Sequence, residues 1–155
     1  MSASLYLAGP EDMDRLLPMV AAFHAFEGIA STETTRREAI APLLEGSPHG
    51  AIWLIGPRRG PVGYIAITFG WSIEMGGLDG FIDELFIREN VRGRGMATEA
   101  LTALMPYLAK AGLKALHLEV PRGYTGARDV YEKQGFKSRD NYHLMTWLAK
   151  ATPEA

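Results

Sequence analysis

The stretch Asp83-Glu-Leu-Phe-Ile-Arg-Glu-Asn-Val-Arg-Gly-Arg-Gly-Met-Ala97 decides the fold of this chain. It begins inside a segment, Phe81 to Ile87, whose apolar residues fall on both faces, as expected of a central strand covered by helices. A short loop with two glycines follows and leads directly into a helix with an apolar stripe. The first amides of a helix lack partners within the helix, and the helix dipole adds positive charge there. The strand, loop and helix therefore predict an anion cradle, to which Arg92 and Arg94 add charge for a phosphorylated ligand.

Three alternatives compete for this loop. It is compatible with a polar turn before a surface helix. A dinucleotide-binding fingerprint has three glycines at fixed spacing near the first strand, with an acidic residue about twenty residues on. Here the loop lies in the second half of the chain and has two glycines, although Glu119 falls at a plausible distance. A Walker loop is excluded because no Gly-Lys-Ser or Gly-Lys-Thr follows.

Glycine and proline divide the rest of the chain into short elements. Before the loop we expect a strand over residues 4–8 and a helix that opens at 9–12 and ends at Gly28. A second helix is capped by Thr34 or Thr35 and stops at Gly46. Paired strands over 51–55 and 62–71 and a glycine-rich bend at 76–80 follow. Pro42 predicts a kink or an early end in the second helix. After the loop we expect a helix over 97–112, a strand over 116–120, a short helix over 126–133 and a final pair of strands within 136–148. This order indicates a mixed α/β fold with helices on both faces of a sheet.

Composition narrows the class of protein. The 155 residues are 47% hydrophobic and 22% charged, which is typical of one globular domain. The net charge of −2 argues against a nucleic-acid binder. No apolar run approaches the ~20 residues of a membrane helix, and no signal peptide is evident, so we expect a soluble cytoplasmic protein. Without cysteine the chain has no thiol catalysis, and its four scattered histidines show no metal spacing, so no metal is predicted.

Two blocks of the chain resemble the GCN5-related N-acetyltransferase (GNAT) superfamily. Its first signature is Arg or Gln, two residues, Gly, one residue, then Gly or Ala, and it matches Arg92, Gly95 and Ala97. The second block is a strand, an Asn, an Ala three residues on, a Tyr four further and then Gly-Phe. It matches Ala127, Tyr131 and the pair at 135–136, with Tyr124 standing where Asn is most common. The resemblance covers nearly the whole chain. It implies a single GNAT domain over residues 1–155, with a mixed, mostly antiparallel, splayed central sheet flanked by helices on both faces.

The same resemblance implies a binding site for acetyl-CoA. The pyrophosphate would lie on the amides of residues 93–97, and the pantetheine arm would pair with the backbone of the central strand as a substitute strand. The residues implied in cofactor binding are Leu85, Phe86, Ile87, Arg92, Gly93, Arg94, Gly95, Met96, Ala97, Tyr124, Ala127 and Arg128.

Two residues are candidates for catalysis. Tyr131 matches the family's usual general acid, and a phenol of pKa ~10 can protonate the departing thiolate. A core tyrosine is the alternative. Glu84 is the candidate base, because a carboxylate inside an apolar strand is costly unless it has a use or a partner. A hydrogen-bonded structural acid is the alternative there, and Asp83 is a rival for the role of base.

The resemblance also implies an acceptor site along the first two helices and the loop between them. Candidates are Phe23, His24 and Glu27, and His24 and Glu27 share a helix face, where they would hold an ammonium group or, as the favoured alternative, form a surface ion pair. Trp71 and Glu74 are candidates for a further wall.

These observations predict an acetyl-CoA-dependent N-acetyltransferase that acts by direct transfer to a primary amine on a small molecule or a peptide. A non-catalytic acyl-CoA-binding module on the same fold and a nucleotide-binding protein are the alternatives. We expect neither a nucleic-acid nor a membrane partner, and the resemblance leaves a homodimer open. Polyamines, aminoglycosides, amino acids and protein amines all remain open as acceptors.

Overall fold

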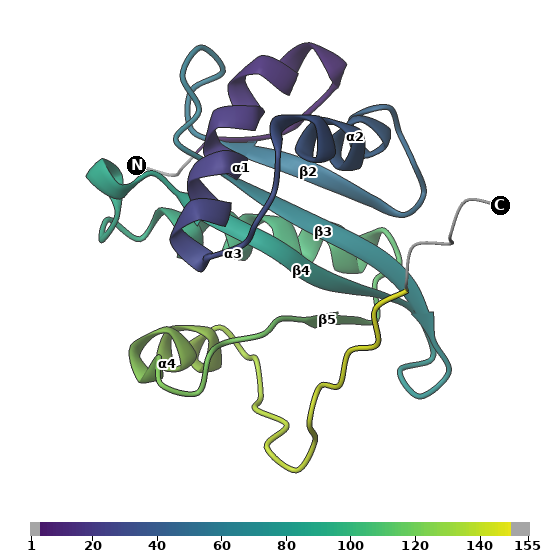
Figure 1. The fold of residues 1–155 in the computed structure, drawn as a ribbon. Coiled ribbons are helices and arrows are strands. Elements are labelled where there is room, and N and C mark those ends of the chain that lie inside the picture. The colour runs from purple at the N-terminus through teal and green to yellow at the C-terminus, as the bar shows by residue number, and fades with distance from the viewer. Residues whose placement is uncertain (1–3, 150–155) are drawn as a thin grey trace, which may run out of the picture. The chain divides into compact units, whose positions relative to one another are not determined.

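A computed structural model describes residues 4–149, which fall into two compact units that divide after Pro121. Among the described residues, five strands form one sheet in the first unit, in the order β1-β2-β3-β4-β5 (Figure 1). The first three pairings are antiparallel and the last is parallel, which confirms the predicted mixed sheet. The strands are β1 (Leu5–Leu7), β2 (Gly50–Ile55), β3 (Gly63–Ser72), β4 (Gly77–Ile87) and β5 (Ala115–His117).

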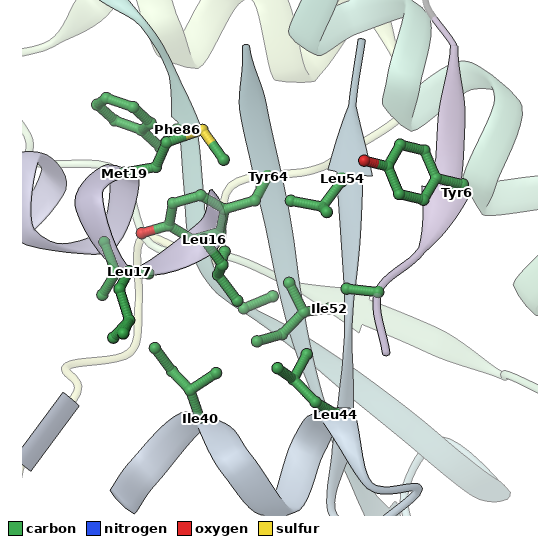
Figure 2. Packing of buried hydrophobic residues seen from close by; sticks show 13 residues of the cluster. Tyr6, Leu16, Leu17, Met19, Ile40, Leu44, Ile52, Leu54, Tyr64 and Phe86 are labelled. Atoms are coloured by element: carbon green, nitrogen blue, oxygen red, sulfur yellow. The ribbon is translucent and has the colours of Figure 1, made fainter. Parts of the chain in front are cut away.

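Helices cover both faces of this sheet, as predicted. The 3-10 turn η1 (Pro10–Asp12) leads into α1 (Met13–Glu27), which ends at Gly28 in the left-handed conformation with φ +70°. This helix and α2 (Glu33–Leu44) lie over one face, where their apolar side chains point at those of the strands (Figure 2). The opposite face is covered by α3 (Met96–Lys110).

The core on the α1 and α2 side is built from aliphatic side chains and a few aromatic ones. Its members are Tyr6, Ala8, Leu16, Leu17, Met19, Val20, Ile40, Leu44, Ile52, Leu54, Tyr64, Ala66 and Phe86. The buried side of α3 is Ala100, Leu101, Leu104 and Leu108, the apolar stripe that the sequence predicts. The central strand is thus sandwiched between two apolar layers, which explains why its apolar residues fall on both faces.

Local geometry corrects two predicted element ends. The cap of α2 is Thr32 rather than Thr34 or Thr35, because the Thr32 side chain accepts a hydrogen bond from the Thr35 amide. The helix runs through Pro42 to Leu44, and Gly46, just after the C-cap residue Glu45, takes the left-handed conformation with φ +90°, in agreement with the predicted stop. Strand β4 begins at Gly77, so most of the predicted glycine-rich bend is strand, and the turn lies just before it.

The C-terminal prediction was partly wrong. Helix α4 (Thr125–Lys133) forms as expected, but β5 has three residues and no residue described after it is in a strand. The predicted strands within 136–148 do not form a backbone ladder. The amide of Tyr142 instead closes a turn onto the carbonyl of Arg139. A strand needs a partner for its amides, and alternation of apolar residues alone does not supply one.

Substitution of Gly63 tests how tightly β3 and β4 pack. A Cβ there would collide with the carbonyl oxygen of Phe86 and lie 2.7 Å from Cδ1 of Ile87. We expect Gly63→Ala to lower the free energy of unfolding by about 1–3 kcal/mol, as overpacking does, measured by urea denaturation. Gly60→Ala is the matched control, because a Cβ at Gly60 meets no atom within 4 Å. Equal stability of the two variants would contradict this packing.

Candidate active site

The loop between β4 and α3 has the open form of an anion cradle. After β4 the chain makes the 3-10 turn η2 (Glu89–Val91) and then passes through Gly93 and Gly95, both left-handed with φ of +79° and +73°. Gly95 is the N-cap of α3, and no side chain caps the helix there. A Cβ on either glycine would meet no atom within 4 Å, so the space over the loop is open. The amides of the first turn therefore face a region that a phosphate group fits.

Arg92 and Arg94 differ in how they are held. The Nε of Arg92 donates a hydrogen bond of 2.8 Å to the carbonyl of Ile87. Its guanidinium carbon lies 5.3 Å from the ring centroid of Phe26 and 5.6 Å from that of Phe86. Arg92 thus ties the loop to the end of β4 and to the last turn of α1. Arg94 is exposed.

Strand β4 has a free edge over its second half. It pairs with β5 only through Asp79, Gly80 and Phe81, and Nε2 of His117 lies 3.3 Å from Oδ2 of Asp79 beside this short ladder. Among the described residues, none pairs as a strand with that edge between residues 82 and 87. The three predicted pantetheine contacts, Leu85, Phe86 and Ile87, lie in this unpaired half. The sheet is therefore splayed where the sequence predicts it.

A β-bulge sets which face of the sheet Glu84 occupies. Ala66 pairs with Glu84 and Ile67 pairs with Ile82, so Asp83 is the extra residue that has no partner on β3. Adjacent residues of β3 point to opposite faces. Ile82 therefore lies in the layer of Ile67, whereas Glu84 joins Ala66 on the α1 side.

Glu84 accepts hydrogen bonds from two other elements. The hydroxyl of Tyr64 on β3 donates to Oε1 over 2.7 Å. Nε2 of His24 on α1 lies 2.7 Å from Oε2, and the side chains of His24 and Glu84 are 15% and 18% exposed. The carboxylate is therefore held on both oxygens and still reaches solvent, which are the conditions that a general base needs.

The far side of His24 is held by the loop between α1 and α2. Nδ1 of His24 lies 2.7 Å from the hydroxyl of Ser31. Nη1 of Arg36 donates to the carbonyl of Ser31 over 2.8 Å and to its hydroxyl oxygen over 2.9 Å. An ionised carboxylate can only accept, so the Nε2 that faces Glu84 carries the ring proton. Nδ1 of the neutral ring then accepts from the Ser31 hydroxyl, whose oxygen in turn accepts from Arg36.

Two titratable groups beside Glu84, the phenol of Tyr64 and the carboxyl of Asp83, have raised pKa values. Burial, followed by the negative charge of Glu84, raises the pKa of Tyr64 far above that of an ordinary phenol, so Tyr64 stays a donor. Asp83 lies at an exposed position, yet partial desolvation and the charges of Glu84 and Glu119 raise its pKa.

The structure brings together some predicted acceptor residues and separates others. Both ring nitrogens of His24 are occupied by Ser31 and Glu84, so the predicted pair with Glu27 does not form. Phe23 packs edge-on against Tyr64 and Phe86, at centroid distances of 6.4 Å and 6.3 Å. It therefore belongs to the margin of the core.

Trp71 and Glu74 lie at the other end of the β3–β4 hairpin from Glu84. Trp71 pairs with Leu78, six positions before Glu84 on β4, which is about 20 Å at the rise of a strand. The structure does not bring these two residues to the carboxylate. A large acceptor would be needed to span that distance.

Sequence reasoning missed Tyr64 and Arg36. The signal for Tyr64 is a phenol within the buried first half of β3, and the hairpin register pairs it with Phe86, next to Glu84 in the same layer. Arg36 carries no comparable signal, because its role depends on how the loop after α1 turns back.

The second unit carries the remaining predicted residues on or beside α4. Tyr131 is half-buried and packs edge-on against Phe136 at 5.8 Å and 74°, and burial raises the pKa of its phenol. Arg128 binds the carboxylates of Glu132 at 2.9 Å and Asp140 at 3.5 Å. Tyr124 stands just before the helix and is exposed, and Ala127 lies in its first turn.

Comparison with protein families agrees with this geometry. The model of the Acetyltransferase (GNAT) family matches residues 19–136, which include α1, the loop after β4 and α4. The chain belongs to the GNAT acetyltransferase family. No match was found among curated proteins.

Solved structures show the same fold. An integron cassette protein, HFX_CASS3, from the mobile metagenome of Cole Harbour Salt Marsh is 32% identical to this GNAT chain, with a TM-score of 0.81 over 95% of this chain and 91% of that one. A ribosomal-protein-alanine N-acetyltransferase from Brucella melitensis biovar Abortus 2308 is 16% identical, with a TM-score of 0.72 over 97% and 100%. An aminoglycoside acetyltransferase, HMB0005, from an uncultured soil metagenomic sample is 17% identical, with a TM-score of 0.70 over 98% and 100%.

No helix within residues 4–149 combines the length and apolar character needed to cross a membrane. Over the same residues, His, Asp and Glu side chains form no group of three that would hold a metal ion.

Asp83→Asn tests the electrostatics of the bulge. The folded pKa of Asp83 lies above its ordinary value of 3.8, so between the two values the unfolded chain binds fewer protons, and stability falls as pH rises through that window. We therefore expect Asp83→Asn to be more stable than the wild type at neutral pH, and the difference to shrink below pH 3.8. Urea denaturation of the wild type and the variant, at neutral pH and below pH 3.8, measures this difference in stability.

A second background isolates the cause of the shift. In a Glu84→Gln background the gain at neutral pH should be smaller, because one of the charges that raises the pKa of Asp83 is gone. A gain that is the same at every pH would show that the amide helps for another reason.

Proposed function

We propose that this GNAT protein is an N-acetyltransferase that moves the acetyl group of acetyl-CoA directly to a primary amine within a ternary complex. The observation that carries the proposal is the position of Glu84. A doubly hydrogen-bonded carboxylate lies on the half of β4 whose edge is free, a few residues before an open glycine loop. The family match supports acyl transfer as the class of reaction.

The residues of the first unit fit the ligand that the family implies. The open loop at 93–97 and the exposed Arg94 suit a pyrophosphate, and the free edge of β4 offers backbone groups to an extended amide-bearing arm. Leu85, Phe86 and Ile87 would supply that edge. Acetyl-CoA brings a thioester, which is an activated acyl group with a thiolate leaving group.

Two residues divide the proton transfers in this proposal. A protonated amine of pKa ~10 must lose a proton before it attacks, and Glu84 takes that proton, directly or through a water molecule. Tyr131 gives a proton to the departing thiolate. Burial raises the pKa of Tyr131, so the phenol keeps its proton at neutral pH and can donate it to sulfur as the carbon–sulfur bond breaks.

In this proposal, the residues around His24 and in the loop after α1 determine which amine binds. Two solved neighbours are a ribosomal-protein-alanine N-acetyltransferase and an aminoglycoside acetyltransferase, so proteins of this fold act on acceptors of very different size. A small-molecule or peptide amine is the proposed acceptor of this chain. A cytoplasmic location, a homodimer and the lack of nucleic-acid and membrane partners stay predictions.

Calorimetric titration with acetyl-CoA tests the loop. Gly95→Trp should abolish binding, because an indole would fill the space over the amides. Gly112→Trp is the matched control: Gly112 is also left-handed, with φ +113° and nothing within 4 Å, but it follows the other end of α3. Equal loss in both variants would indicate backbone strain rather than a blocked site. Retained binding in Gly95→Trp would contradict a phosphate site on this loop.

Turnover tests the two proton transfers. With a panel of a polyamine, an aminoglycoside, an amino acid and a peptide with a free amino terminus, thiol release should fall about 10²–10⁴-fold in kcat for Tyr131→Phe and for Glu84→Gln, as for loss of a general acid or base. Acetyl-CoA affinity should not change in either variant. Binding without turnover by the wild type would favour a non-catalytic acyl-CoA-binding module, and stronger binding of NAD or ATP would favour a nucleotide-binding protein.

A further inference from the structure

We propose that His24 is a positioning residue for Glu84: its Nε2–H orients the carboxylate, and Ser31 and Arg36 fix the tautomer and the ring. The inference rests on the proposed role of Glu84 as the base, and it goes beyond that role by assigning a task to three residues from α1, α2 and the loop between them.

The first step is the geometry of the carboxylate. Glu84 has one donor on each oxygen, Tyr64 on Oε1 and His24 on Oε2, both at 2.7 Å. A glutamate side chain has three rotatable bonds, and holding it in one rotamer costs entropy. Donors from two different elements hold the plane of the carboxylate, so the remaining lone pairs keep a constant direction. With Tyr64 alone, the plane would rotate about a single hydrogen bond.

The second step is the tautomer of His24. A neutral imidazole donates from one nitrogen only, so Nε2–H requires an unprotonated Nδ1. Ser31 supplies the matching donor, because an unprotonated Nδ1 can only accept and the Ser31 hydroxyl lies 2.7 Å from it, while its oxygen accepts from Arg36. Arg36 therefore donates to Ser31, Ser31 donates to His24, and His24 donates to Glu84. A second group that selects the histidine tautomer is a recurring arrangement around functional histidines.

The third step links the base to the acceptor side of the site. Arg36 also donates to the carbonyl of Ser31, so the same guanidinium holds the backbone of the connection between α1 and α2. The charged and titratable groups that face His24 are Glu84 and Asp83 from β4, Tyr64 from β3 and Arg36 from α2. The hydrogen bonds of Arg36 that order this loop therefore also help to orient the base.

Two amide substitutions test the contacts of the two ring nitrogens of His24 one at a time. The side-chain nitrogen of Gln reaches the place of Nε2, so His24→Gln keeps a donor to Glu84. The side-chain amide of Asn reaches only the place of Nδ1, so His24→Asn keeps the contact with Ser31 and loses the one with Glu84. His24→Ala removes both contacts.

Steady-state kinetics on the full chain tests the role, with acetyl-CoA and the same panel of amines. We expect His24→Gln to keep kcat within about threefold, because its hydrogen bond to the carboxylate remains. His24→Asn and His24→Ala should lose about 10²-fold in kcat, as for a misplaced catalytic group. KM for acetyl-CoA should not change in any of them. Urea midpoints measured in parallel separate loss of folding from loss of orientation.

Two kinetic results would overturn the proposal. If His24→Gln loses as much kcat as His24→Asn, the imidazole is needed for something that an amide donor cannot do, such as proton transfer. If all three variants keep the kcat of the wild type, the bond to Glu84 has no part in orienting the base.

A measurement that does not need turnover distinguishes this proposal from the proposed function. Nitrogen-15 NMR of the histidine rings should show His24 as the Nε2–H tautomer with a slowly exchanging proton, and Ser31→Ala should make that proton exchange faster. An Nδ1–H tautomer in the wild type would overturn the positioning role. Absence of turnover with every amine, together with the expected NMR result, would refute the reaction and retain the hydrogen-bonded arrangement.

Discussion

One extra residue in β4 governs the arrangement of this site. The bulge at Asp83 lets Ile82 and Glu84 occupy opposite faces of the sheet, although a regular strand would place them on the same face. Without it, Glu84 and Ile82 would share one layer, and on the α3 side that layer consists of Ile65, Ile67 and the apolar stripe of α3. A carboxylate there would be desolvated without a donor, at a cost of several kcal/mol. On the α1 side it meets a phenol and an imidazole instead.

The second constraint is the early end of the β4–β5 ladder. Three residues pair in parallel and then β5 ends, so the half of β4 that carries Glu84 keeps an open edge. An open edge is a liability in most sheets because its amides and carbonyls invite another strand. In this protein the turn η2 joins the edge to the glycine loop, so the backbone groups that a ligand would use follow one another along the chain from β4 to α3.

Aromatic and cation–π contacts join the glycine loop after β4 to α1. Phe86 lies against Phe23 and Tyr64, and Arg92 lies over Phe86 and Phe26 while it binds the carbonyl of Ile87. The planar guanidinium combines stacking with a directed hydrogen bond, which a lysine would not reproduce. The anion cradle and the helix that carries His24 are therefore held by the same side chains.

The sequence by itself determined the element order as far as α4, the central strand, the glycine loop and the apolar stripe of α3, because these depend on local periodicity and on conformations that glycine favours. It also identified Glu84, since a carboxylate in an apolar strand is conspicuous. Only the tertiary structure decided the partners of Glu84. His24 lies 60 residues away along the chain, and its bond to Glu84 depends on a bulge and on the register of β3 with β4, neither of which leaves a local pattern. The predicted C-terminal strands failed for the same reason: alternation is local, but a strand exists only where a partner accepts its hydrogen bonds.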